Sequence, residues 1–161
     1  LLGPMFKAAG TAPLLAIPLK GPYASRDIPR TARFMKIPYK HPETFPIGTQ
    51  NAARAFYWLN DRDPVKAHQF AMACYATYFA QGIDIFPAEK VADIAASLGE
   101  DRAQVLAAWA DPAIKERLKN EVDAALAKGV FGSPYFIVDG EPFWGNDRLD
   151  QLDAWLATGG F

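Results

Sequence analysis

The sequence predicts an α/β protein that is mostly helical and carries one β-hairpin near its C-terminus. Two observations predict this class. Residues 135–138 and 141–144 are short runs of β-favouring residues, and the Asp139-Gly140 pair between them is a strong two-residue hairpin turn. The rest of the chain is divided by glycine, proline and capping residues at intervals that suit helices.

These breaks delimit the expected helices in order. Residues 1–9 should form a short helix that Gly10 ends, and a second helix fits between Pro22 and Lys36. A proline-rich loop over 37–48 follows. The later helices are expected at 52–60, at 65–81 after Asp63-Pro64, from Pro87 to Gly99, after Asp101, and at 112–128 between Asp111-Pro112 and Gly129.

The last helix is expected to follow the hairpin directly. Gly145 breaks the second strand, Asn146 is a good N-cap, and Asp147 in the first turn complements the helix dipole. Leu149, Leu152 and Leu156 then recur at helical spacing. The helix should therefore pack its apolar side against the hairpin.

Composition excludes several classes of function. Half of the residues are hydrophobic and 22% are charged, which is typical of a globular protein with a sizeable core. The formal net charge is −1 with both signs interspersed, so nucleic acid is not an expected partner. No apolar run reaches the roughly 20 residues that span a bilayer, so a membrane is not expected as a partner. The expected location is the cytoplasm.

Cysteine and histidine usage excludes two further kinds of site. Cys74 is the single cysteine, and without a Cys-x-x-Cys pair the residues shown cannot perform dithiol redox chemistry. Its small and aromatic neighbours at helical spacing indicate a buried packing thiol. His41 and His68 do not form a metal-ligand pattern, so no metal is expected.

The entry to the hairpin is the strongest candidate for a binding site. Pro134 stands where the first strand should begin, directly after Gly132 and Ser133. A proline there leaves the backbone groups of Ser133 without strand partners unless something else pairs with them. A ligand with a peptide-like backbone is one such partner.

Two motifs at this spacing carry a family resemblance. A Gly-x-Pro strand entry followed by Trp144-Gly145-Asn146-Asp147-Arg148-Leu149 resembles the C-terminal half of a thioredoxin fold. More closely, it resembles the 2-hydroxychromene-2-carboxylate isomerases and the related kappa-class glutathione transferases. The resemblance covers the whole chain. Upstream segments in the family's order are Leu1-Leu2-Gly3 with Phe6, Gly10 to Pro13, Lys20-Gly21-Pro22-Tyr23, Asp27, Ile37-Pro38 and Phe45-Pro46.

The resemblance implies a thioredoxin-like fold with an all-helical insertion. The thioredoxin-like domain would comprise residues 1–48 and 111–161, and the inserted helical domain residues 49–110. The family's first βαβ unit, with a Ser-Pro pair whose serine meets the glutathione sulfur, has no match here. Because numbering starts at Leu1 without a methionine, we expect this unit in a longer polypeptide, and the catalytic residue is unassigned.

Glutathione is the cofactor that the resemblance implies. It places Ser133, with a cis peptide bond to Pro134, beside the cysteinyl part of glutathione, and Asn146 and Asp147 beside the γ-glutamyl end. A helix start with an adjacent carboxylate suits an α-amino acid head group. The alternative is that Asn146 and Asp147 only stabilise the helix.

Two further residues are weaker candidates. Thr11 stands where relatives often have an asparagine near glutathione, and Lys20 matches a basic residue near the substrate carboxylate. A single lysine is also commonly a solvated surface charge. Several aromatic residues either line an aromatic-substrate pocket or belong to the core, namely Trp58, Trp109, Trp144, Tyr23, Tyr39 and Phe45.

The function implied is that of a glutathione-dependent isomerase in aromatic catabolism. It would interconvert 2-hydroxychromene-2-carboxylate, a small aromatic carboxylate, and trans-o-hydroxybenzylidenepyruvate, and a homodimer is a possible state. The alternatives are a kappa-class-like glutathione transferase and a non-catalytic thioredoxin-like binding module. A Ser-Pro pair in an upstream unit would favour glutathione chemistry, and its replacement by Cys-x-x-Cys would favour redox work.

Overall fold

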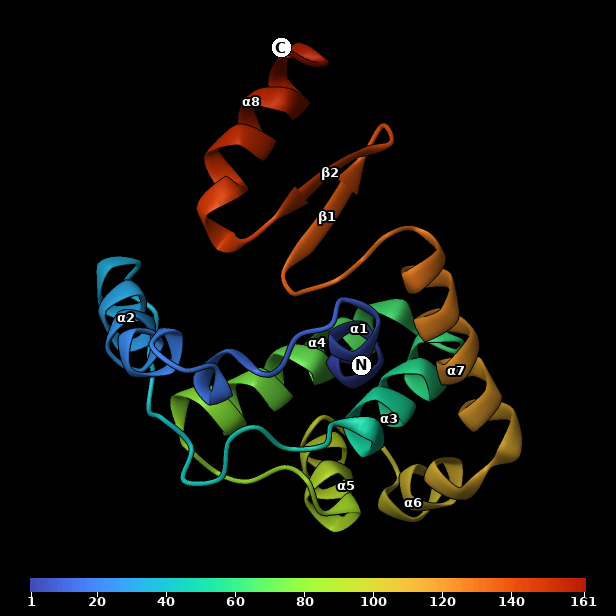
Figure 1. Ribbon diagram of the computed structural model, residues 1–161. Helices are drawn as coiled ribbons and strands as arrows, with labels where there is room; N and C mark the ends of the chain where they lie inside the picture. Colours follow the sequence, from blue (N-terminus) through green and yellow to red (C-terminus); the bar gives the residue numbers. More distant parts are fainter. The chain divides into compact units, whose positions relative to one another are not determined.

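The computed structural model describes all residues from 1 to 161, and the chain forms two compact units (Figure 1). The first unit consists of Leu1 and residues 12–122, and the second of residues 2–11 and 123–161. Helix α7, Pro112–Ala127, crosses the boundary between them. The proposed insertion, residues 49–110, lies wholly within the first unit.

The first unit is entirely helical. The expected helices are present with shifts of a few residues at their ends. They are α2 Lys20–Phe34, α3 Gln50–Asn60, α4 Pro64–Tyr75 with η2 Ala76–Ala80, α5 Ala88–Ser97, α6 Arg102–Ala110 and most of α7. The short 3-10 helix η1, Leu14–Ala16, is not expected from the sequence. One expectation is wrong: the run 65–81 is not one α-helix, because its last turn widens into the π-helical η2. The hydrophobic pattern does not distinguish these two windings over five residues.

Aspartate side chains fix the starts of three of these helices. Asp63 accepts hydrogen bonds from the N–H groups of Val65 and Lys66, both at 3.1 Å. Asp101 does the same for α6, and Asp111 accepts from the second residue of α7 at 2.8 Å. These contacts satisfy backbone donors that have no partner within the helix, so each boundary is set locally, as expected from the sequence.

The core of the first unit lies between α3, α4, α5 and α6. Phe70, Leu59 and Val91 are its largest fully buried side chains, with alanines between them. The small alanines let the helices approach closely around these larger residues. Cys74, on α4, is buried in the same cluster.

The second unit contains the hairpin and the last helix. Strand β1, Tyr135–Val138, pairs antiparallel with β2, Glu141–Trp144, through a turn in which Asp139 and Gly140 both have positive φ. This is the expected hairpin turn. Helix α8, Leu149–Thr158, lies beside the hairpin, where the ring centroids of Phe143 and Trp155 are 5.8 Å apart (Figure 1). Helix α1, Leu2–Ala8, also belongs to this unit.

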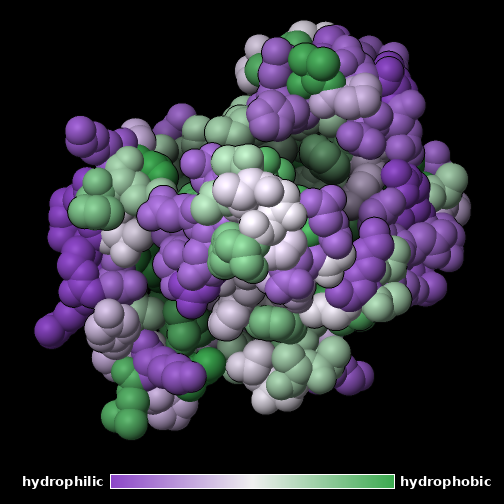
Figure 2. Space-filling view, turned by 90° about the horizontal axis from the view of Figure 1, so that it is seen from above, coloured by the Kyte–Doolittle hydropathy of each residue, from purple (hydrophilic) through white to green (hydrophobic).

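The face of the molecule seen in Figure 2 carries both hydrophilic and hydrophobic residues. Purple and green residues alternate over its middle, and mostly purple residues cover its left edge and upper right. None of the helices combines the length and the apolar character that crossing a membrane requires.

Gly21 offers a test of the packing between η1 and α2. A Cβ atom at this position would lie 2.3 Å from the backbone oxygen of Leu15, which cannot move aside as a flexible side chain does. We expect Gly21→Ala to lower the free energy of unfolding by about 1–3 kcal/mol, the usual effect of overpacking. Urea denaturation followed by circular dichroism measures this change.

Gly3→Ala is the matched control, since no atom outside its own helix and neighbours lies within 4 Å of its added Cβ. Its free energy of unfolding should stay the same or rise slightly, because alanine favours helix formation. Equal stability of the two variants would contradict the close approach at Gly21.

Candidate functional site

The predicted strand entry is formed as expected. The peptide bond between Ser133 and Pro134 is cis, which confirms the prediction made from the sequence. The carbonyl oxygen of Pro134 accepts a hydrogen bond from the N–H of Gly145 at 3.1 Å. Both residues of the Ser133-Pro134 pair are exposed, and no backbone hydrogen bond within the chain involves Ser133. Its N–H and C=O groups are therefore available to an extended ligand.

The turn before α8 brings the second pair of predicted residues to the same end of the hairpin. Gly145, with φ of 108°, leads into a 3-10 turn, η3, spanning Asn146–Arg148. The Asp147 carboxylate folds back over Gly145, where a Cβ would meet its Oδ1 at 2.3 Å. Its Oδ2 lies 3.1 Å from Nη1 of Arg148. The carboxylate is well exposed, so it can also contact a ligand.

The helix start differs in one respect from the sequence expectation. Asn146 is not the N-cap of an α-helix, because it is the first residue of η3 and the α-helix begins only at Leu149. The tighter 3-10 winding at a helix N-terminus is common and is not distinguishable from an α-helical first turn by residue types. Within this turn the N–H of Arg148 donates to the carbonyl oxygen of Gly145 at 3.3 Å.

An aromatic cluster lies beside the proline; of its members, Trp144 is predicted from the sequence as a residue of either a substrate pocket or the core, whereas Phe131 and Tyr135 are not. Phe131 packs edge-on against Tyr135 and Trp144, with ring centroids 5.3 and 4.8 Å away. Trp144 is opposite Tyr135 in the strand register, and its Nε1 would lie 2.5 Å from a Cβ at position 132. Gly132 is therefore required by the indole. The Gly-x-Pro motif marks the glycine, but sequence spacing alone does not reveal its partner.

The two remaining candidates are not joined to this corner by hydrogen bonds. Thr11 belongs to the second unit and ends α1, where its N–H donates to the carbonyl of Phe6 at 2.9 Å and Gly10 has positive φ. This is the usual glycine-based helix ending. Lys20 is exposed at the first residue of α2, in the first unit. Their roles toward glutathione and the substrate remain predictions.

Cys74 and His41 are not expected to belong to the candidate site, and their surroundings are as follows. Burial raises the pKa of the Cys74 thiol to about 12, so the thiolate is strongly disfavoured. His41 lies in a loop, where its Nδ1 is 2.7 Å from the hydroxyl oxygen of Tyr39. No cluster of three or more potential metal-ligating side chains is present in residues 1–161.

A β-hairpin followed by a helix that lies beside it is the arrangement expected for the C-terminal half of a thioredoxin-type domain. The sequence matches the DsbA-like thioredoxin domain over residues 1–157. The chain therefore belongs to the DsbA-like thioredoxin family, in a helix-rich form with a small sheet.

Within this family, the chain is similar to two groups of proteins. The chain is 31% identical over 130 residues to a 2-hydroxychromene-2-carboxylate isomerase of Sphingobium xenophagum, covering 81% of the chain and 65% of that protein. It is 28% identical over 155 residues to glutathione S-transferase kappa 2 of Caenorhabditis elegans, covering 89% of the chain and 69% of that protein. The resemblance to both groups is thus confirmed.

A solved structure agrees with the sequence comparison. The structure of a 2-hydroxychromene-2-carboxylate isomerase superposes with a TM-score of 0.84 at 25% sequence identity. The match covers 98% of this chain and 76% of the solved one. The predicted thioredoxin-like fold is therefore confirmed.

The raised pKa of Cys74 has a measurable consequence. A rise from 9.0 to about 12 reduces the thiolate fraction near neutral pH about a thousandfold, so iodoacetamide at pH 8 should label the native protein far more slowly than the urea-unfolded protein. Because the folded state holds this proton more tightly, its stability should also fall as pH rises from 9 toward 12. Fast native labelling, followed by mass spectrometry, would contradict the burial of this thiol.

Proposed function

We propose that this protein is a glutathione-dependent isomerase related in activity to 2-hydroxychromene-2-carboxylate isomerase. The observation that carries the proposal is the corner where Ser133, Asn146 and Asp147 meet. It offers the backbone groups of Ser133, which no hydrogen bond within the chain uses, the start of the turn that leads into α8, and the exposed carboxylate of Asp147. These features match, in order, a peptide backbone, a carboxylate and an ammonium group. The γ-glutamyl-cysteinyl part of glutathione contains all three.

The proposed binding mode follows from this arrangement. The cysteinyl residue of glutathione pairs, strand-like, with the backbone of Ser133 beside Pro134. The γ-glutamyl carboxylate meets the N–H groups of the turn at Asn146, and its ammonium group meets Asp147. Thr11 is proposed as a further glutathione contact on the strength of the family resemblance alone.

The proposed chemistry is a reversible addition of glutathione. Opening of the cyclic hemiketal of the chromene acid first gives a C=C bond conjugated with a ketone. The glutathione thiolate adds to this acceptor, forming a C–S bond and an enolate, so that the former double bond can rotate. The enolate then re-forms the ketone and the double bond as it expels the same thiolate. Glutathione is thus regenerated, and the reaction is an isomerisation. Hydrogen-bond donors at the sulfur would lower the thiol pKa, and Lys20 is proposed to hold the substrate carboxylate.

Several wider properties are proposed with this function. The division into a thioredoxin-like domain of residues 1–48 and 111–161 and an inserted domain of 49–110 follows the resemblance. A cytoplasmic location, a role in aromatic catabolism and a homodimeric state belong to the same proposal. The bilayer and nucleic acid are not proposed partners, since the near-neutral net charge provides no long-range attraction to either.

The kappa-class relatives support a second candidate function. A glutathione transferase would use the same corner but leave glutathione attached to its electrophile. The nature of the product separates the two, because only the isomerase returns free glutathione. A non-catalytic binding module would bind glutathione without turning over either kind of substrate.

The activity itself is tested with the full-length protein. We expect the absorbance of 2-hydroxychromene-2-carboxylate to change toward that of trans-o-hydroxybenzylidenepyruvate only when glutathione is present, with no loss of free thiol at completion. Consumption of glutathione in a stoichiometric adduct would assign the protein to the transferase reaction. Glutathione-independent conversion would contradict the proposed mechanism.

Asp147 provides the sharper test of the binding corner. Asp147→Asn keeps the shape of the side chain but removes the charge that would meet the glutathione ammonium. A hydrogen bond to a charged group contributes about 1.5–3 kcal/mol, and about 1.4 kcal/mol is a factor of ten in affinity. We therefore expect the glutathione dissociation constant, measured by calorimetry, to rise about ten- to a hundredfold with a nearly unchanged melting temperature.

Asp150→Asn is the matched control, since Asp150 is also exposed and lies in the first turn of α8. Its glutathione affinity should stay near that of the unchanged protein. A thiol ligand without the γ-glutamyl amine should show a smaller effect of Asp147→Asn. If Asp147→Asn binds glutathione normally, its carboxylate acts only on the helix dipole.

A further inference from the structure

The three residues before Pro134 are not held by backbone hydrogen bonds. On one side of them, the N–H of Val130 donates to the carbonyl oxygen of Ala125 in α7 at 3.0 Å, and on the other side Pro134 is tied to the turn after β2. Between these two points, no backbone group of residues 131–133 makes a hydrogen bond within the chain. The position of Ser133 therefore depends on how its neighbours are packed.

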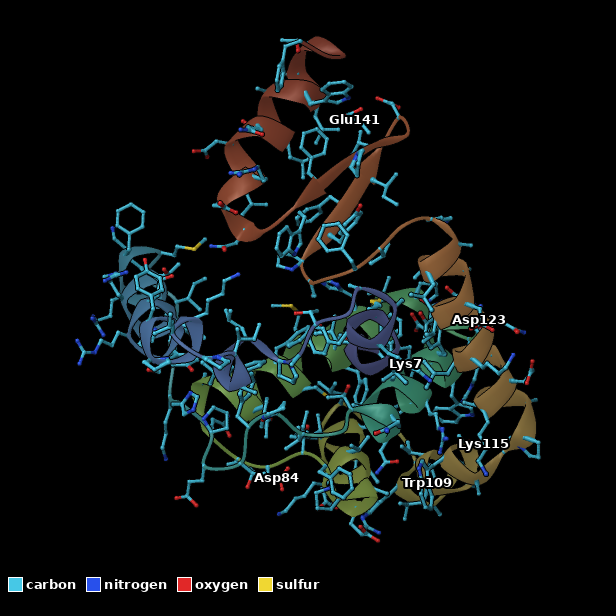
Figure 3. The ribbon with its side chains drawn as sticks, in the orientation of Figure 1. Lys7, Asp84, Trp109, Lys115, Asp123 and Glu141 are labelled. Atoms are coloured by element: carbon cyan, nitrogen blue, oxygen red, sulfur yellow. The ribbon has the colours of Figure 1, made fainter.

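The indole of Trp144 supplies this packing. A Cβ at Gly132 would lie 2.5 Å from its Nε1 and 3.2 Å from its Cδ1 and Cε2, so the five-membered ring lies against the glycine backbone. The Phe131 ring packs edge-on against the same indole, and Tyr135, opposite Trp144 in the strand register, contacts Phe131. In Figure 3, where Glu141 marks the turn end of the hairpin, side-chain rings gather at the opposite end.

The same indole contributes little to the rest of the second unit. Successive residues of a strand point to opposite faces of a sheet. Phe143 lies on the face that packs against α8, next to the Trp155 ring, and is 6% exposed. Trp144 lies on the other face and is 55% exposed. Loss of the indole should therefore loosen the strand entry and leave the packing of the hairpin on α8 intact.

Gly132 is required by this ring and not by its own backbone conformation. It is not among the glycines with positive φ, so its backbone would accept alanine. The three atoms nearest to its added Cβ all belong to Trp144. The two positions should therefore be energetically coupled.

We propose that Trp144 is a positioning residue for glutathione. Its indole holds residues 131–133 from one side, while the hydrogen bond from Gly145 holds Pro134 from the other. The N–H and C=O groups of Ser133 thus keep one orientation for pairing with the cysteinyl backbone of the ligand. Groups that are fixed before binding lose less entropy when the ligand arrives. The inference rests on the function proposed above and assigns Trp144 a role in affinity, not in the chemical step.

Calorimetry with reduced glutathione and the full-length protein tests the affinity. Trp144→Ala should raise the dissociation constant about three- to tenfold, with a nearly unchanged melting temperature. Trp144→Phe keeps a ring against Phe131 and should recover part of this loss. In the isomerase assay, the KM for glutathione should rise while kcat stays nearly the same, because the contact is made equally before and during the reaction.

A double-mutant cycle tests the contact between the ring and the glycine. Gly132→Ala should weaken glutathione binding by a factor similar to that of Trp144→Ala, because the added methyl group displaces the indole. In the Trp144→Ala protein the space is free, so adding Gly132→Ala should have little further effect. Effects of the two changes that simply multiply would overturn the proposal.

Nitrogen-15 relaxation of the free protein tests the positioning without a ligand. The amides of Gly132 and Ser133 should be as ordered as those of β1 in the unchanged protein and clearly less ordered in Trp144→Ala. Ile137→Ala is the matched control, since Ile137 lies on the same face of the hairpin as Trp144 and is 42% exposed. It should change neither the order of these amides nor the glutathione affinity.

The outcomes separate this inference from the proposed function. Normal glutathione affinity of Trp144→Ala, unchanged order at Ser133 or an equal loss of affinity in Ile137→Ala would overturn the role of Trp144 alone. Failure of Trp144→Ala to fold would also overturn it, because the indole would then support the unit as a whole. Absence of glutathione binding by the unchanged protein would overturn the proposed function, and this role with it.

Discussion

The hydrogen bond from Gly145 N–H to the Pro134 carbonyl holds together the end of the hairpin on which the candidate site depends. It continues the β1–β2 pairing by one step beyond the strands, at 3.1 Å. Because it joins the residue before β1 to the residue after β2, it places the strand entry beside the start of the following turn. Together with the pairing of Tyr135 and Trp144, it sets Ser133 and Asp147 at the same end of the hairpin.

Glycine is required on both sides of this contact for different physical reasons. Gly145 has a backbone conformation that side chains rarely adopt, and the Asp147 carboxylate occupies the space of its absent Cβ. At Gly132 the indole of Trp144 comes equally close. The corner is therefore compact because two side chains lie against glycine backbone, which keeps the polar groups at its rim exposed.

Local chemistry explains which parts of this structure the sequence predicts. Three features depend only on residues within a few positions of one another, namely the Asp139-Gly140 turn, the aspartate cap at Asp63 and the glycine at Gly10 that ends a helix. The sequence therefore predicts them without knowledge of the tertiary packing. The π-helical turn at 76–80 and the Trp144–Gly132 contact depend on packing.

The groups of the candidate corner differ in how strongly the fold secures them. The backbone groups of Ser133 and the start of the turn before α8 can be supplied by many residue types once the fold is kept. A TM-score of 0.84 at 25% identity is compatible with keeping such groups while most side chains change. The carboxylate of Asp147 is different, because a single substitution removes it. The contact proposed for Asp147 is therefore a property of this chain's own residues rather than of its fold.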